Sequence, residues 1–141
     1  MKDSFRSSLT HLSPFEKIIR WIPSTIIMGI IFASSNQTSM DIPNFGLFDF
    51  LVKKAGHIIG YALLSTTLFY GFGWKKQKMF LVFFLSIIYA GSDEFHQSYI
   101  SGRTSSMYDV LVYDQIGTLL GLGISLIVLR FTQIRAQIPR H

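Results

Sequence analysis

The stretch that decides the fold is "LVFFLSIIYAGSDEFHQSYISGR", residues 81–103, where an apolar run becomes charged with no turn signal between. Only fourteen residues separate Lys78 from Asp93. As a helix they reach ~21 Å, about two-thirds of a hydrocarbon core of about 30 Å. A helix that crosses a membrane must therefore continue past Asp93, and its acidic side chains then lie within the bilayer rather than in a loop beyond it.

The composition favours a membrane protein that forms one compact unit. Of the 141 residues, 49% are hydrophobic and 15% are charged, and thirteen are Phe, which is too apolar for an ordinary soluble domain. The chain has no cysteine, so disulfides and thiolate chemistry are excluded. The net charge of +5 suits an anionic lipid surface. No basic patch is interleaved with aromatic residues, so no nucleic-acid partner is expected.

Four apolar segments approach the ~20 residues that a membrane-spanning helix needs. They run from about Ile18 to Ser35, from Ala55 to Trp74, from Met79 past Asp93, and from Tyr108 to Arg130 or Phe131. The sequence therefore predicts an all-α, polytopic membrane protein with four transmembrane helices. The predicted domains are an N-terminal cytoplasmic segment (1–17), the four-helix domain (18–131) and a cytoplasmic tail (132–141).

The first segment has a competing interpretation. A basic start, an apolar stretch and the small residues of "FASS" also fit a cleaved signal peptide. Pro23 and the interfacial pair Arg20 and Trp21 favour a retained span.

The basic residues predict the orientation of the four helices. Three of the thirteen, Lys53, Lys54 and Arg103, fall on one side of the membrane. The other ten fall on the opposite side: Lys2, Arg6, Lys17, Arg20, Lys75, Lys76, Lys78, Arg130, Arg135 and Arg140. Because Lys and Arg accumulate in cytoplasmic segments, both termini are expected inside the cell.

The same length argument brings polar residues of all four helices to one depth near the outer surface. These residues are Ser34, Ser35, Asn36, Lys54, His57, Tyr61, Asp93, Glu94, His96, Gln97, Asp109 and Asp114. A charge exposed to lipid costs a few kcal/mol, so they are expected to face the bundle interior or a water-filled cavity.

Small residues four apart should allow two helices to pack closely at this depth. Gly56 and Gly60 form one such pair, and Gly117 and Gly121 form another. Asp114 shares a face with the second pair, so it should meet a Lys, Arg or His on a neighbouring helix.

Four motifs follow one another across about residues 18–130: "FASSNQ", Lys54-x-x-His57-x-x-x-Tyr61, "SDEFHQSYISGR", and Asp109-x4-Asp114-x2-Gly117-x3-Gly121. In this order they resemble the VanZ-like family of small bacterial membrane proteins, named for a protein that gives low-level teicoplanin resistance. The resemblance implies a multi-pass protein of the bacterial inner membrane. It also implies that the family's characteristic positions are Ser34, Ser35, Lys54, His57, Tyr61, Asp93, Glu94, Gln97, Arg103, Asp109, Gly117 and Gly121.

The chain departs from the family pattern at two positions. Asp114 stands where an asparagine is expected, and Ser101 precedes "GR" where a proline is common. The first departure adds a charge, which favours an ion pair or a bound cation over a neutral amide contact.

Two interpretations of the polar residues remain open. In the first they do acid–base chemistry, with Glu94 or Asp93 paired with His57 as hypothetical catalytic residues. A carboxylate in a low-dielectric pocket can have a raised pKa, and histidine titrates near neutrality. The candidate substrate-binding residues are then Ser34, Ser35, Lys54, Tyr61, Gln97, Arg103, Asp109 and Asp114. In the second, Lys54 and Arg103 neutralise the acids, and the network only fixes helix register.

Other chemistries fit less well. His57, His96, Glu94 and Asp109 lack a tight ligand spacing such as HExxH, so no metal or other cofactor is expected. The serines of "FASSNQ" lack the GxSxG elbow of a serine nucleophile. Four short helices enclose too little space for transport, although a homo-oligomer could form a path.

The sequence therefore predicts a cell-envelope protein whose partners are membrane lipids. It is expected to bind or modify a lipid or lipid-linked cell-wall component and so to influence teicoplanin susceptibility. Whether it is an enzyme stays open. The alternative is a non-catalytic assembly or signalling subunit whose polar network is structural.

Overall fold

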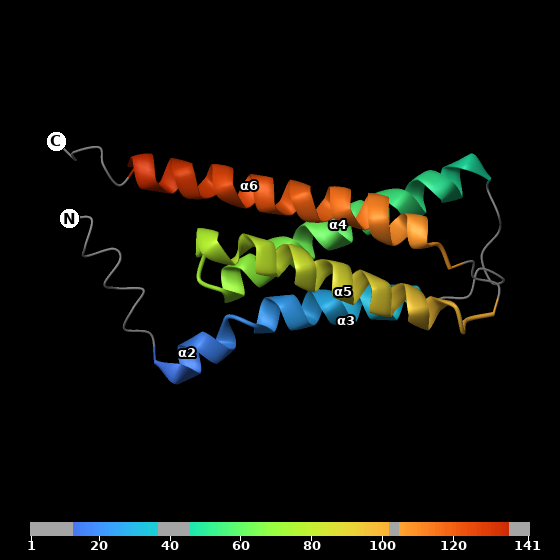
Figure 1. Cartoon of the computed structure of the whole chain (residues 1–141), viewed down its shortest axis with the longest axis horizontal. Helices are drawn as coiled ribbons and strands as arrows, with labels where there is room; N and C mark the ends of the chain where they lie inside the picture. Colours follow the sequence, from blue (N-terminus) through green and yellow to red (C-terminus); the bar gives the residue numbers. More distant parts are fainter. Residues whose placement is uncertain (1–12, 37–45, 102–104, 136–141) are drawn as a thin grey trace.

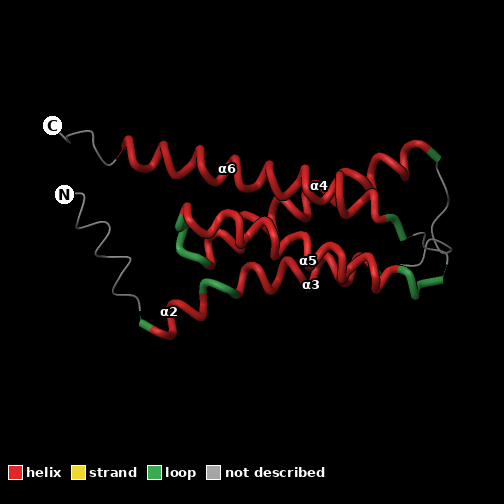
Figure 2. The backbone as a smooth tube through the Cα atoms, viewed as in Figure 1, coloured by secondary structure: helices red, strands yellow, loops and turns green. Residues whose placement is uncertain are grey.

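The computed structural model describes residues 13–36, 46–101 and 105–135, and this part of the chain contains helices and loops but no strand (Figure 2). The helices are α2 (Pro14–Ile19), α3 (Ile22–Ser35), α4 (Leu47–Gly71), α5 (Met79–Gln97) and α6 (Asp114–Arg135). A short 3-10 turn, η2 (Lys76–Lys78), precedes α5, and a π-helical turn, η3 (Asp109–Tyr113), precedes α6. The predicted all-α fold is confirmed for the described residues.

Three stretches of the described chain are long and apolar enough to cross a membrane: Pro14–Ser35, Lys76–Gln97 and Asp109–Gln133. The sequence predicted four such helices, and the described chain has three, so this part of the prediction is wrong by that criterion. The helix that falls short is α4, although its 25 residues would suffice in length. Its composition is less apolar because Lys53, Lys54 and His57 lie in its first half.

The first predicted span is two helices with a break between them. Ser13 and Glu16 cap α2 reciprocally: the Ser13 backbone N–H donates to Glu16 Oε2 at 2.7 Å, and the Glu16 N–H donates to Ser13 Oγ at 3.2 Å. The chain turns at Arg20 and Trp21, and α3 restarts with Pro23 in its first turn, where the missing N–H costs no hydrogen bond. The Trp21 ring packs edge-on against Phe72 at the end of α4.

Helix α5 begins at Met79 and continues past Asp93 to Gln97, which confirms the prediction made from its length. Its buried face carries Val82, Ser86 and Ala90, followed by the polar residues Asp93, Glu94 and Gln97. Large apolar side chains, among them Phe80, Phe84 and Ile88, lie exposed on the outside of the same helix. The charged end of α5 is therefore turned toward the bundle interior and its apolar surface outward.

Helices α4 and α6 pack together closely because α6 carries glycines at the contact. A Cβ added to Gly117 would collide with the Ile58 carbonyl oxygen, and one added to Gly121 with that of Ala62. The other predicted pair behaves differently: an added Cβ on Gly60 would lie 3.4 Å from Ile31 on α3, and one on Gly56 would meet nothing within 4 Å.

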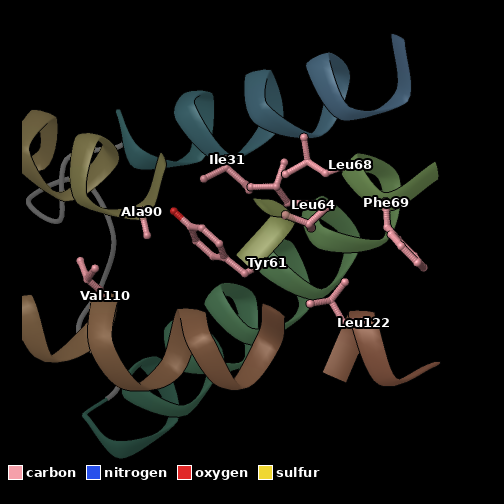
Figure 3. Packing of buried hydrophobic residues seen from close by; sticks show 9 residues of the cluster. Ile31, Tyr61, Leu64, Leu68, Phe69, Ala90, Val110 and Leu122 are labelled. Carbon is pink, nitrogen blue, oxygen red and sulfur yellow. The ribbon is translucent and has the colours of Figure 1, made fainter. Parts of the chain in front are cut away.

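The hydrophobic core lies between α4 and its neighbours (Figure 3). Its members are Ile31, Tyr61, Leu64, Leu68, Phe69, Val82, Ala90, Val110 and Leu122. The core is small for the chain's apolar content, because most large apolar side chains are exposed on the outside of the bundle. Such a surface is expected of helices that face lipid rather than water.

The bundle has two distinct ends (Figure 1). At one end lie α2 and the turn between α4 and α5, which carries Lys75, Lys76 and Lys78. At the other end α3 and α5 finish, and α4 and η3 begin. The second end is where the predicted site residues meet.

Candidate functional site

The contact between α3 and α5 is a buried hydrogen-bonded set of three side chains. The Ser35 hydroxyl donates to Asp93 Oδ2 at 2.7 Å. Gln97 Nε2 donates to the same oxygen at 2.8 Å and approaches Ser35 Oγ at 3.2 Å. Two donors therefore satisfy one oxygen of the Asp93 carboxylate.

A second buried contact joins α4 to the first residue of α6. His57 Nδ1 lies 2.8 Å from Asp114 Oδ1, and the Asp114 side chain is almost fully buried. The prediction that Asp114 would meet a basic side chain on a neighbouring helix is confirmed.

The third contact is an ion pair between Lys54 on α4 and Asp109 in η3. The Lys54 ammonium also lies 5.2 Å from the ring centre of Phe50 and 4.9 Å from that of Tyr113. A cation over two aromatic faces is stabilised by both rings. Lys54 is thus held from three sides, at the rim of the bundle.

Glu94 completes the set from α5. It is buried, and Oε1 accepts a hydrogen bond from the backbone N–H of Ser106, just before η3. Glu94 lies in electrostatic range of His57, Asp109 and Asp114.

These side chains form a single electrostatic unit, because Asp114 also lies in range of both Asp93 and Asp109. We call Lys54, His57, Asp93, Glu94, Asp109 and Asp114 the acid–base cluster. In the described chain it places four carboxylates against one lysine and one histidine. No group of three or more His, Cys, Asp or Glu there is arranged to hold a metal ion.

The structure does not bring every predicted site residue into this cluster. Ser34, next to Ser35, is exposed, and its hydroxyl donates to the Ile31 carbonyl of its own helix at 2.8 Å. His96 turns instead to α3, where Nε2 lies 2.7 Å from Asn36 Oδ1 and the ring stacks on Phe32. Arg103 lies outside the described residues.

Tyr61 lies one turn deeper than His57 on α4. Its side chain is 1% exposed, and in the described part of the chain its hydroxyl has no hydrogen-bond partner. Asp114, Asp93 and Glu94 are all within electrostatic range of it.

Two features of the site were not predicted from the sequence. One is the aromatic support of Lys54 by Phe50 and Tyr113. The other is the π-helical turn, whose sequence signal is the spacing of Asp109 and Asp114: side chains five apart on a regular α-helix cannot share a face. π-Helical turns are rare and are frequent at functional sites.

The sequence also matches the model of a known protein family. A family model described as VanZ/LLP1 covers residues 2–129. The chain belongs to the VanZ/LLP1 family. The resemblance inferred from the four motifs is thereby confirmed, and the matched range includes the whole acid–base cluster. Membership of the VanZ/LLP1 family and the three apolar helices together identify a membrane protein. No curated protein and no solved structure matched the chain.

Proposed function

We propose that this VanZ/LLP1 protein is a multi-pass protein of the bacterial inner membrane, with α4 as a fourth span. Its polar residues Lys54 and His57 pair with Asp109 and Asp114 of the neighbouring helix, so they do not need to face lipid. Polar groups inside a membrane are tolerated when they pair in the bundle interior. Hydropathy alone therefore understates how well α4 suits a membrane.

The same proposal places both termini in the cytoplasm. The turn with Lys75, Lys76 and Lys78 lies at the opposite end of the bundle from the acid–base cluster (Figure 1). Basic residues favour the cytoplasmic side, so the cluster belongs to the outer leaflet.

We further propose that the acid–base cluster binds or modifies a lipid or lipid-linked component of the cell wall, and thereby influences teicoplanin susceptibility. The observation that carries this proposal is the burial of four carboxylates beside His57 and Lys54 within a membrane-protein bundle. Buried ionisable groups are costly in such a protein and are commonly functional.

The chemistry available to the cluster is proton transfer. His57 and Glu94 both belong to the acid–base cluster, and we assign to them the roles of proton donor and proton acceptor. Asp93, held by Ser35 and Gln97, supplies a second oriented carboxylate. Lys54 offers a positive charge for a phosphate group of the lipid.

The test is complementation of a strain from which the gene has been deleted. Wild type, Glu94→Gln and His57→Ala are compared for membrane lipids, lipid-linked wall precursors and teicoplanin susceptibility. Ser92→Ala is the matched control, because Ser92 lies beside Asp93 on α5 but is exposed and bonds only its own helix. We expect both variants to lose the wild-type effect: Glu94→Gln at unchanged folded yield, and His57→Ala by more than its lower folded yield accounts for. Full complementation by both would refute acid–base chemistry at the cluster.

A non-catalytic assembly or signalling subunit is the second candidate. The observation in its favour is that Ser35–Asp93, His57–Asp114 and Lys54–Asp109 each join different helical elements. Such pairs can fix helix register with no chemistry. This function predicts that Glu94→Gln complements fully, whereas variants that lower the folded yield do not.

A further inference from the structure

Buried polar atoms without protein partners continue inward from the acid–base cluster. Five side-chain atoms in the described chain are in this state: Tyr61 Oη, Ser86 Oγ, Asp93 Oδ1, Gln115 Oε1 and Thr118 Oγ1. Nearly all buried polar groups in proteins are hydrogen-bonded, to protein or to water. Orphaned atoms on helices that pack against one another therefore indicate bound water.

The spacing of three of these atoms suits water. Asp93, Ala90 and Ser86 share the buried face of α5, and the Tyr61 hydroxyl points toward Ala90 (Figure 3). At ~1.5 Å per residue, the level of Ala90 is ~4.5 Å from that of Asp93 and ~6 Å from that of Ser86. Two hydrogen bonds of ~2.8 Å through one water span ~5.6 Å. Measured along the axis of α5, each of the two intervals is therefore about the length that one bridging water spans.

Helix α6 supplies a further hydroxyl at the same level. Tyr61 lies four residues after His57, and Thr118 lies four residues after Asp114. Since His57 and Asp114 are bonded to each other, Tyr61 and Thr118 stand one turn deeper on their two helices. Three helices therefore contribute unpartnered hydroxyls below the cluster: α4 with Tyr61, α5 with Ser86 and α6 with Thr118.

We propose that Asp93, Tyr61, Ser86 and Thr118 form a polar column that binds internal waters, which hydrogen-bond to the Asp93 carboxylate. A hydroxyl and a water can each donate and accept. A water between two of these groups can therefore donate a hydrogen bond to Asp93 Oδ1 and accept one from a hydroxyl group. The polar column reaches from Asp93 to Ser86, ~10 Å deeper by helix rise. The proposal of a hydrated polar column does not depend on whether the acid–base cluster acts on a lipid.

X-ray radiolytic labelling of the wild-type protein in nanodiscs tests for this water. Hydroxyl radicals formed from bound water modify adjacent side chains even where bulk solvent has no access. Tyr61 is 1% exposed, Phe69 on the same helix is 0% exposed, and Tyr99 is 73% exposed. We expect Tyr61 to be labelled at least five-fold faster than Phe69, approaching Tyr99. Equal, slow labelling of Tyr61 and Phe69 would overturn the proposal.

Removal of single hydroxyls gives an independent measurement. A dry, unpartnered hydroxyl is destabilising, so its removal in Thr118→Val or Ser86→Ala would raise the Tm. A hydrated one loses its bridging water, so we expect both variants to lower the Tm by a few degrees. Thr67→Val is the control, because Thr67 is bonded within its own helix. A raised Tm in both variants counts against the polar column.

Discussion

The backbone N–H of Asp114 donates to the carbonyl oxygen of Asp109, five residues earlier. On a regular α-helix, side chains five residues apart point about 140° away from each other. The π-helical turn adds one residue to the turn. Both carboxylates can therefore face α4. There Lys54 pairs with Asp109, and His57, three residues later, pairs with Asp114.

The turn can be tested by changing its length. Deleting Leu111, which is 63% exposed, leaves the two aspartates four apart on an ordinary α-turn and still on one face. Adding an alanine after Leu111 instead rotates Asp109 about 100° further from Lys54. We expect the deletion to keep the wild-type Tm in detergent and the insertion to cost about 1.5–3 kcal/mol. Tryptophan fluorescence during heating measures both, and an equal loss in the two variants would contradict this account.

The contributions of His57 and Asp114 to the free energy of unfolding should be strongly coupled. In His57→Ala the buried Asp114 carboxylate loses its partner, which should destabilise the protein by about 3–5 kcal/mol. Asp114→Asn, which installs the residue expected from the family pattern, keeps a hydrogen-bonding group without the charge and should cost less. A double-mutant cycle with Asp114→Ala measures the coupling. Strictly additive effects would show that the pair contributes nothing.

The close contact of α4 with α6 predicts opposite effects for two glycines on one helix. Gly117→Ala forces a Cβ into the Ile58 carbonyl, so the helices must separate, at a cost of about 1–3 kcal/mol. Gly123→Ala meets nothing within 4 Å and should be neutral or stabilising by up to about 1 kcal/mol. Thermal unfolding compares the two. Equal stability of both variants would mean that the helices are not held at this contact.

Features that depend on length and chemical type were predictable from the sequence. The continuation of α5 past Asp93 follows from helix rise and membrane thickness, and the basic partner of Asp114 follows from its charge. Features that depend on which face meets which neighbour were not. Ser34 and Ser35 differ by about 100° in direction, and composition cannot show which one meets α5.

The break and the π-helical turn escaped prediction for a related reason. A hydropathy pattern does not show that Arg20 and Trp21 divide the first span into two helices. The π-helical turn brings Asp109 and Asp114 to Lys54 and His57, which are distant from them in the sequence. By hydropathy α4 is likewise less suited to cross a membrane than the other three segments. Hydropathy takes no account of the pairing that shields the charges of α4.

Cysteine labelling tests whether α4 crosses the membrane, and the cysteine-free chain provides a clean background. Leu47 begins α4, Gln77 lies in η2 beyond the other end of α4, and both are exposed. In intact cells a membrane-impermeant maleimide should label Leu47→Cys and, beyond α5, Ser105→Cys. It should label Gln77→Cys only after permeabilisation if the proposed orientation holds, because basic residues such as the neighbouring lysines favour the cytoplasmic side. Labelling of position 77 from outside would reverse the orientation, and labelling of positions 47 and 77 from the same side would remove α4 from the spanning helices.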